Sequence, residues 1–236
     1  MSRETENALL LLIGLSTAII AATGAFMRYV KPALLPWLWA SAVVLIGLAL
    51  VAIVGDIRRG TREHGDNHGD HRHGSGVIWL LVVPIALLAF VVPPPLGPQS
   101  ARPAVAESDA QAPRRPFPPL PAGAAPELSL PALLTRIAQD SAGTLRDRPV
   151  TVTGFTMRDG DRIYLGRIVI LCCAADAQLA RARLTGPAAG AAAALPDGSW
   201  VRVRGTVTDL LQHTAVPEFG IDSVEQVPEP ANTYAF

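Results

Sequence analysis

The chain has 236 residues, of which 50% are hydrophobic and only 17% are charged, and its mean hydropathy is +0.31. These values argue against an ordinary water-soluble enzyme. Its 20 basic and 20 acidic side chains give a formal net charge of zero, so no overall field draws the chain to nucleic acid, and we expect no nucleic-acid partner.

Three uncharged apolar segments lie in the first 92 residues. At about 1.5 Å per residue, the first two approach the roughly 30 Å thickness of a bilayer's hydrocarbon core. The third contains Pro84, which kinks or breaks a soluble helix but is better tolerated in a membrane. We therefore expect a transmembrane region over residues 1–92. Its three helices are expected at about 8–26, 33–55 and 77–92.

A cleaved signal peptide is the alternative for the first segment, because the small residues from Ala21 to Ala25 resemble a processing site. The start of the chain argues against cleavage, since Arg3 is followed by Glu4 and Glu6 and gives a poor positive flank. A further apolar segment also begins only a few residues later.

Positive charges predict the orientation of these spans. Four arginines lie in the loop over 56–76, against Arg28 and Lys31 between the first two spans. The amino terminus and this loop are therefore expected in the cytoplasm of a multi-pass protein of the plasma (inner) membrane. With three spans, the chain after Val92 is extracytoplasmic; if the third segment does not cross, it is cytoplasmic instead.

Residues 93–126 are rich in proline and alanine and lack hydrophobic periodicity, which is typical of an extended linker. After this linker, apolar residues at helical spacing from Leu130 to Ala138, behind Ser129, predict a short amphipathic helix. Alternating patterns then predict strands. The five expected strands cover residues 150–157, 162–173, 180–185, 200–208 and 221–227.

The segment AAGAAAAL, helical or looped, separates the third and fourth of these strands. Five short strands with such an insertion match the outline of the OB-fold, a small Greek-key barrel. The expected fold class is therefore a membrane-anchored α+β protein. It has three N-terminal transmembrane helices, a Pro-rich linker and a small OB-like β-barrel domain over 127–236. Another small antiparallel barrel or sandwich is the alternative.

Four of the five histidines lie in the segment HGDNHGDHRHG of the loop over 56–76. Imidazoles, with the carboxylates of Asp66 and Asp70 nearby, are ligands for zinc, copper or nickel, so a divalent transition metal such as zinc is expected. The alternative is a solvated polar loop that responds to pH near about 6.5. The candidate ligands are His64, His68, His71 and His73.

Cys172, Cys173 and Asp176 form the segment CCAAD at the end of the second expected strand. Thiolates bind soft metals, but a complete zinc site normally needs four ligands, and only His213 is a distant addition. The alternative is that at least one cysteine is a small buried hydrophobe, because neighbours on a strand point to opposite faces.

Common catalytic motifs are missing from the sequence: it has no GxxxxGK[ST] loop, no GxGxxG after a strand, no HExxH and no GxSxG. A catalytic thiol normally requires a histidine beside it, and only His213 is a candidate. We therefore expect that the chain is not an enzyme.

Several motifs occur in a recognisable order. The paired N-terminal spans carry TG…YV.P, a histidine-rich loop precedes another span, and VTVTGF, RIVILCCAADAQ, DGSWVRVRGTV and P.NTYAF follow. In this order the chain resembles the YcgQ-like family of bacterial membrane proteins over nearly its whole length apart from the linker. CCAADA after the RIVI strand is the most specific part. The resemblance implies a subunit of a two-component permease, generally paired with a larger multi-span permease, with metal-related transport suggested for part of the family.

The combination of transmembrane helices, a Pro-rich linker and a small barrel leads to one main functional expectation. We expect an accessory subunit of a two-component membrane permease, held in the lipid bilayer beside a multi-span partner and linked to metal-ion transport. The first alternative is a free-standing metal-binding or metal-sensing membrane protein that uses the histidine-rich loop. The second is a membrane-bound thiol enzyme, which requires a lowered cysteine pKa.

Overall fold

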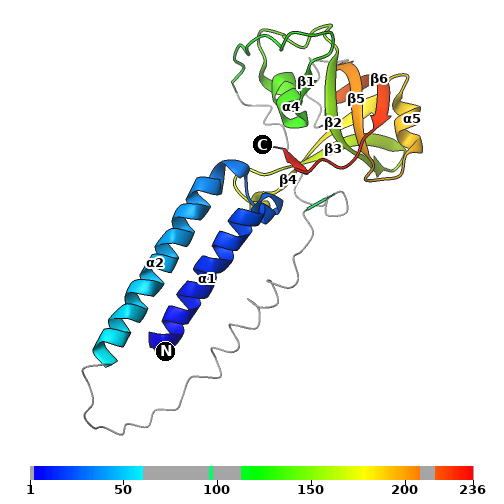
Figure 1. The fold of residues 1–236 in the computed structure, drawn as a ribbon. Coiled ribbons are helices and arrows are strands. Elements are labelled where there is room, and N and C mark those ends of the chain that lie inside the picture. The colour runs from blue at the N-terminus through cyan, green and yellow to red at the C-terminus, as the bar shows by residue number, and fades with distance from the viewer. Residues whose placement is uncertain (1–2, 61–95, 98–112, 208–215, 236) are drawn as a thin grey trace. The chain divides into compact units, whose positions relative to one another are not determined.

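The computed structural model describes residues 3–60, 96–97, 113–207 and 216–235 (Figure 1). The chain divides into two compact units, Met1–Pro94 and Pro95–Phe236, and each is described by itself. The third expected span over 77–92 and the histidine-rich loop from 61 onward lie outside the described residues.

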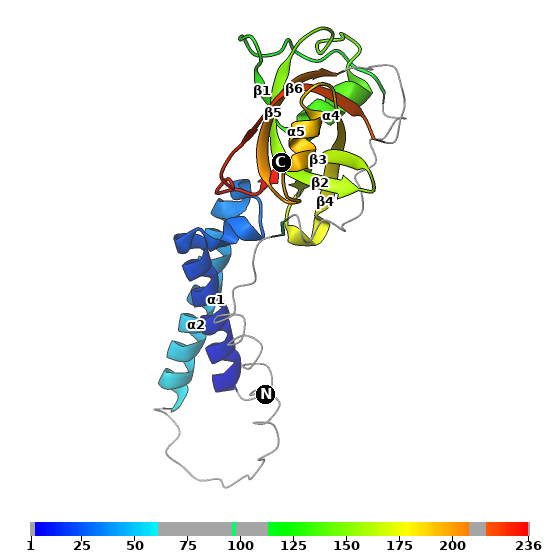
Figure 2. The same ribbon diagram turned by 90° about the vertical axis from the view of Figure 1, so that its right-hand side faces the viewer.

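The first unit contains two long helices, α1 (Arg3–Thr23) and α2 (Leu35–Gly60), which lie side by side (Figures 1 and 2). They are joined through two short 3-10 helices, η1 (Ala25–Arg28) and η2 (Pro32–Leu34). Gly24 follows α1 with φ +75°, a left-handed conformation that glycine adopts without strain and that commonly ends a helix.

Two segments are apolar enough to cross a membrane, one within α1 and one that runs from η2 into α2. The segments are Glu6–Thr23, with a mean hydropathy of 1.7, and Pro32–Gly55, with a mean hydropathy of 2.5. Many apolar side chains on α2 are exposed, including Val51 at 73%, as expected of a helix surrounded by lipid. The structure thus contains two candidate spans among its described residues. Since a signal sequence has the same length and composition, cleavage remains the alternative for α1.

The second unit is built on one seven-stranded sheet with the order β1-β2-β5-β6-β4-β3-β7. Its strands are β1 (Glu127–Leu128), β2 (Val150–Asp159), β3 (Arg162–Val169), β4 (Gln178–Thr185), β5 (Trp200–Val207), β6 (Glu218–Gln226) and β7 (Tyr234–Ala235). Its helices are α4 (Leu130–Gln139), η4 (Ala174–Asp176) and α5 (Ala189–Ala194).

The five longer strands correspond to those expected from the sequence, and their pairings run in a cycle. The first half of β2 pairs with β5, and its second half, from Phe155 to Asp159, pairs with β3. β6 pairs with β5 on one side and, in parallel, with β4 on the other. The close approach of β2 to β3 requires glycine, since a Cβ on Gly154 would lie 2.6 Å from the carbonyl oxygen of Gly166.

Two short strands extend this arrangement beyond the expectation. β1 pairs in parallel with β2, and β7 pairs in parallel with β3 through Ile168↔Tyr234 and Val169↔Ala235. The result is a seven-stranded sheet with β1 and β7 at its edges, and not a plain five-stranded closed barrel. Strands of two residues are too short to show an alternating pattern, which is why the sequence did not indicate them.

Helix α4 begins at the expected cap, where the Ser129 hydroxyl accepts a hydrogen bond from the N–H of Ala132 at 3.3 Å. Its apolar face is buried in the main core, where Leu133 is fully covered. Burial of one such leucine contributes about 1.5–3 kcal/mol. The main core includes Leu130, Leu133, Leu134, Ile137, Val150, Val152, Leu165, Val203, Phe219 and Ile221.

The second half of the expected linker packs on this domain. Leu120 is buried in the main core, and the backbone N–H of Phe117 donates to the carboxylate of Asp140 at 3.3 Å. Arg115 and Asp140 also form a β-bridge. Residues from 113 onward therefore contribute to the domain, whereas 98–112 lie outside the described residues.

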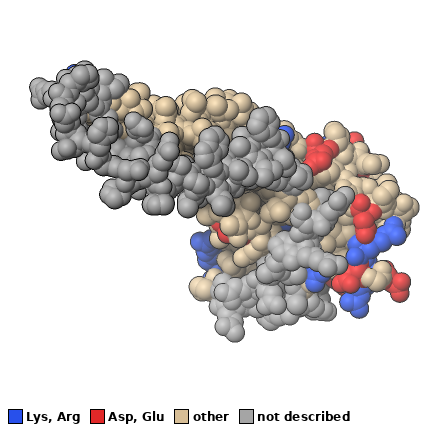
Figure 3. Space-filling view, turned by 90° about the horizontal axis from the view of Figure 1, so that it is seen from below, with Lys and Arg blue, Asp and Glu red and all other residues tan. Residues whose placement is uncertain are grey.

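On the surface of this domain, acidic and basic side chains intermingle on the face shown in Figure 3. Ion pairs join Arg183 to Glu218 at 2.9 Å and Arg158 to Asp197 at 3.6 Å. Exposed pairs of this kind contribute about 0–1 kcal/mol each to stability. No single-sign patch is visible on the described part of this face.

Candidate metal site in the loop after β3

The cysteines lie in a turn and not on a strand. The sequence predicted a strand as far as Cys173, but β3 ends at Val169 and the chain then turns into η4. Leu171 is 71% exposed, Cys172 is exposed and Cys173 is half-buried. The interpretation that one cysteine is a buried hydrophobe is therefore wrong.

The carboxylate of Asp176 causes this turn. Its Oδ1 accepts a hydrogen bond from the N–H of Leu171 at 2.7 Å, and its Oδ2 accepts from the N–H groups of Cys172 at 2.8 Å and Cys173 at 3.2 Å. These N–H groups are then no longer free to extend a strand ladder. In return, the Cys173 side chain accepts from the backbone N–H of Asp176, which completes a capping box at the start of η4.

The geometry of the three side chains suits a soft metal ion. The two Sγ atoms are 3.7 Å apart, and one ligand atom from each of Cys172, Cys173 and Asp176 lies within 4.8 Å of the others. Two thiolates bound tetrahedrally to zinc at about 2.3 Å would be separated by about 3.8 Å. The observed sulfur separation therefore needs almost no change to hold such an ion.

The protonation states of the loop follow from its hydrogen bonds. A hydrogen bond to Asp176, and then the contact with Cys173, raises the pKa of Cys172 to about 11. The thiol of Cys172 in turn lowers the pKa of Asp176 to about 2, helped by the backbone N–H groups. Near neutral pH the site thus contains a carboxylate beside a protonated thiol. Such a thiol is a poor nucleophile, and a metal ion must displace its proton on binding.

The structure brings together only part of the expected ligand set. Cys172, Cys173 and Asp176 converge on one loop, and they form the group of three potential ligands found among the described residues. His64, His68, His71 and His73, as well as His213, lie outside the described residues.

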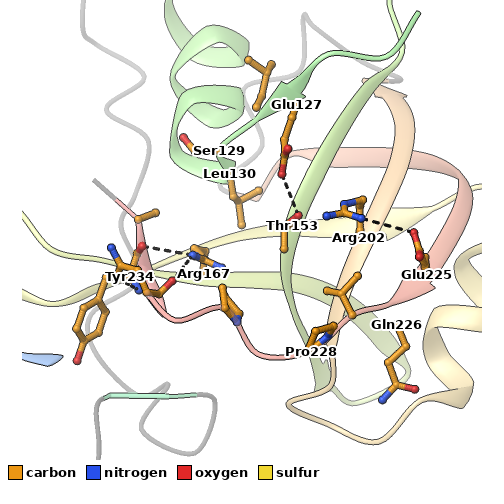
Figure 4. Close-up of a pocket in the computed structure, with 15 residues that line it drawn as sticks. Glu127, Ser129, Leu130, Thr153, Arg167, Arg202, Glu225, Gln226, Pro228 and Tyr234 are labelled. Atoms are coloured by element: carbon orange, nitrogen blue, oxygen red, sulfur yellow. Dashed lines mark hydrogen bonds and ion pairs between the residues drawn. The ribbon is translucent and has the colours of Figure 1, made fainter. Parts of the chain in front are cut away.

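The sequence interpretation missed a pocket on another part of the domain. Its volume is about 740 Å³, and it is lined by residues of β1, β2, β3, β5, β6 and β7, of the start of α4 and of the segment before β7 (Figure 4). Arg167 on β3 and Arg202 on β5 both line it. The lining segments are far apart in the sequence, so no local pattern indicates the pocket. The one signal is Arg167, a charged residue within the apolar pattern of β3.

Two protein-family models match the chain, one in each of its two units. No curated protein and no solved structure matches the chain significantly. Residues 8–100 match the DUF1980 N-terminal domain, and residues 132–236 match the DUF1980 C-terminal domain. The first match covers both candidate spans almost completely, and the second contains the Cys172–Cys173–Asp176 loop. The chain therefore carries the N-terminal and the C-terminal domains of DUF1980.

Proposed function

We propose that the chain is a membrane-anchored accessory subunit of a two-component permease, and that its C-terminal domain binds a soft divalent metal ion through Cys172, Cys173 and Asp176. The observation that carries the proposal is the convergence of these three ligand groups within 4.8 Å of one another on an accessible loop. A site that is open on one side suits an ion that has to be taken up and passed on.

The pairing pattern supports an OB-like module as the scaffold of this site. β2 to β6 pair in a cycle, β4 and β6 pair in parallel, and α5 lies between β4 and β5. This order of pairings is compatible with the small Greek-key barrel that we propose, within a seven-stranded sheet that ends in β1 and β7. Such modules commonly bind ligands or partners and do not need catalytic residues.

The composition of the two candidate spans supports a multi-span partner. Between Ala8 and Thr23, and between Pro32 and Gly55, the sequence contains no Asp, Glu, Lys, Arg or His. A pathway for ions across a membrane normally requires such groups or water-filled cavities. We infer that another protein supplies the pathway, in agreement with the resemblance to the YcgQ-like family.

The proposed orientation separates the two sets of candidate ligands. It puts the histidine-rich loop, with His64, His68, His71 and His73, in the cytoplasm, and the loop of Cys172 on the opposite side. One ion cannot then be shared between them, so the missing ligands of the Cys172 site come from water or from the partner.

The test is purification of the full-length protein from its native membrane in mild detergent, followed by mass spectrometry of bound proteins and elemental analysis of bound metal. We expect a stoichiometric multi-span partner and a metal content that falls by one equivalent in the Cys172→Ser/Cys173→Ser double variant. Ser223→Ala, a change at an exposed residue of β6, is the matched control and should leave the metal content unchanged.

Two outcomes would contradict the proposal separately. A protein that purifies without a multi-span partner, yet still binds metal, would be the free-standing metal-binding protein of the first alternative. Unchanged metal content in the double cysteine variant would show that the Cys172 loop does not bind the metal.

The proposed membrane orientation is tested by adding protease to intact spheroplasts. Cleavage of the C-terminal domain is expected, and protection of this domain would contradict the orientation.

A further inference from the structure

The pocket beside β1 and β2 has the size of a site for a small molecule. Its volume of about 740 Å³ lies within the range of roughly 300–1,000 Å³ that is usual for such sites. Its walls come from six strands, from the start of α4 and from the tail between β6 and β7, so the folded domain forms it as a whole (Figure 4).

Arg167 is the most unusual group in this wall. Its Nη2 donates to the backbone carbonyls of Asn232 at 2.9 Å and Tyr234 at 3.3 Å, as Figure 4 shows. Its guanidinium carbon lies 4.6 Å from the ring centre of Trp200, in a cation–π arrangement. Burial lowers the pKa of Arg167, which means that its surroundings disfavour the charge.

No ion pair joins Arg167 to a carboxylate in the part of the chain that the structure describes. The two glutamates of the pocket have other partners. Glu225 forms an ion pair with Arg202 at 3.8 Å, and Glu127 accepts a hydrogen bond from the Thr153 hydroxyl at 3.4 Å. A half-buried cation without a counter-ion is therefore present in a pocket of suitable size.

The rest of the wall combines polar residues, such as Ser129, Gln226 and Asn232, with a group of apolar residues. The apolar group consists of Leu128, Leu130, Val227, Pro228, Pro230 and Ala235. An inorganic anion would leave this apolar surface in water, whereas an organic anion with an apolar body would cover it. The lining thus favours a ligand with one anionic end and an apolar body.

We propose that this pocket binds a small organic carboxylate, whose carboxylate pairs with the guanidinium of Arg167 and whose body packs on Leu128, Val227 and Pro228. The contacts with Trp200 and the two carbonyls hold Arg167 in place before the ligand arrives, so little side-chain freedom is lost on binding. A guanidinium can bind a carboxylate through two parallel hydrogen bonds, which adds directional specificity. The proposal goes beyond the metal site and does not depend on it.

The probes for the test are 3-phenylpropanoate and its neutral amide, 3-phenylpropanamide, titrated calorimetrically into the full-length protein in detergent. The two compounds have almost the same shape and differ in charge. We expect the acid to bind at least about tenfold more tightly than the amide, because only the acid pairs with Arg167. Equal affinity, or no binding of the acid, would overturn the proposal. Inorganic phosphate is the third probe. If phosphate bound as tightly as the acid, the proposal that the ligand is an organic anion would be overturned.

Arg167→Gln is expected to weaken binding of the acid at least about tenfold and to abolish its advantage over the amide. Arg204→Gln is the matched control, because Arg204 lies on β5 two residues from Arg202, is exposed and does not line the pocket. If Arg204→Gln weakened binding equally, Arg167 would not be the anchor.

Since Arg167 also packs on Trp200, Arg167→Gln has to retain the circular dichroism spectrum of the unchanged protein. If Arg167→Gln does not fold, two other measurements test the proposal. They are binding of the acid to Arg167→Lys and the comparison of acid with amide on the wild-type protein. Arg167→Lys keeps the charge and should retain part of the preference for the acid; loss of this preference in a folded Arg167→Lys variant would contradict the proposal. The Cys172→Ser/Cys173→Ser variant should bind the acid normally, so failure at the pocket is distinguishable from failure at the metal site.

Discussion

Asp176 acts on Cys172 in two ways: its Oδ2 accepts the backbone N–H of Cys172 at 2.8 Å, and its carboxylate raises the pKa of the Cys172 thiol to about 11. One residue thereby shapes the loop and keeps the thiol protonated. A protonated thiol reacts slowly with electrophiles, so Cys172 is expected to be a poor nucleophile near neutral pH.

The first prediction concerns Asp176→Asn. Without the carboxylate, the pKa of Cys172 should fall from about 11 toward its ordinary value near 9, so the thiolate forms at lower pH. The measurement is the rate of alkylation by iodoacetamide between pH 7 and about 11, resolved for each cysteine by mass spectrometry. Asp222→Asn, at an exposed position of β6, is the control. An alkylation profile that is the same in both variants would show that Asp176 does not control the thiol.

The second prediction concerns Asp140, a buried carboxylate that joins α4 to the segment before it. Burial alone would raise the pKa of Asp140, but hydrogen bonds from Thr144, Ala142 and Phe117 outweigh burial and lower it. The Thr144 N–H and hydroxyl lie 2.7 and 2.6 Å from Oδ2. Asp140→Ala should cost about 3 kcal/mol of unfolding free energy, because several buried donors lose their acceptor.

The pH dependence of this effect has a definite sign. A carboxyl whose pKa is lowered by folding stabilises the protein fully above its unfolded value of about 3.9, and this stabilisation is lost as the pH falls through the folded value. The unfolding temperatures of the full-length protein and of Asp140→Ala should therefore differ most above about pH 5 and converge in acid. Glu229→Ala, at an exposed site, should show no difference at any pH. If the difference between the two unfolding temperatures did not change with pH, the charge of the Asp140 carboxylate would not contribute to stability.

The third prediction concerns the pairing of β5 with β6, whose register shifts between Arg204 and Gly205. A Cβ on Gly205 would lie 2.0 Å from the carbonyl oxygen of Gly220, which belongs to the backbone and cannot give way. Gly205→Ala should therefore destabilise the domain by at least about 2 kcal/mol. Gly190→Ala in α5 meets no atom within 4 Å and should be neutral or stabilising by up to about 1 kcal/mol. Similar unfolding temperatures for the two variants would refute the close contact.

The fourth prediction concerns the packing of α1 on α2. A Cβ on Gly14 would lie 2.8 Å from Cγ1 of Ile46 and 3.1 Å from its backbone nitrogen, so the two helices approach closely there. Small residues at such points allow membrane helices to pack. Gly14→Val should lower the unfolding temperature in detergent, while Gly47→Val, which faces open space, should have little effect. The opposite order would mean that the helices pair through another face.

Much of the β domain could be predicted from its sequence because each long strand buries one face. The alternation of Val150 and Val152 with polar residues, and the Ser129 cap of α4, are local signals. The end of β3 was not predictable in this way, because Ile170 to Cys173 continues the apolar run of the strand. The turn there depends on three hydrogen bonds to Asp176, a side chain that lies further along the sequence.

The candidate sites were predictable to different extents. Adjacent cysteines followed by an aspartate form a local pattern, and the sequence singled them out as ligands. The pocket around Arg167 combines β1, β3 and β5 with the tail before β7, and only tertiary structure brings these segments together. The role of Trp200 beneath Arg167 likewise has no local signal.

The parallel pairing of β4 with β6, and of β3 with β7, affects the order in which the domain can fold. In these pairs Leu184 meets Phe219 and Ile168 meets Tyr234, so most of the domain must be synthesised before either pair can form. Chains dominated by such distant contacts fold slowly, in about milliseconds to seconds. If the domain is extracytoplasmic, as proposed, it would cross the membrane as an unfolded chain, and both cysteines would be exposed to the oxidants of the outer compartment before Asp176 could restrain them.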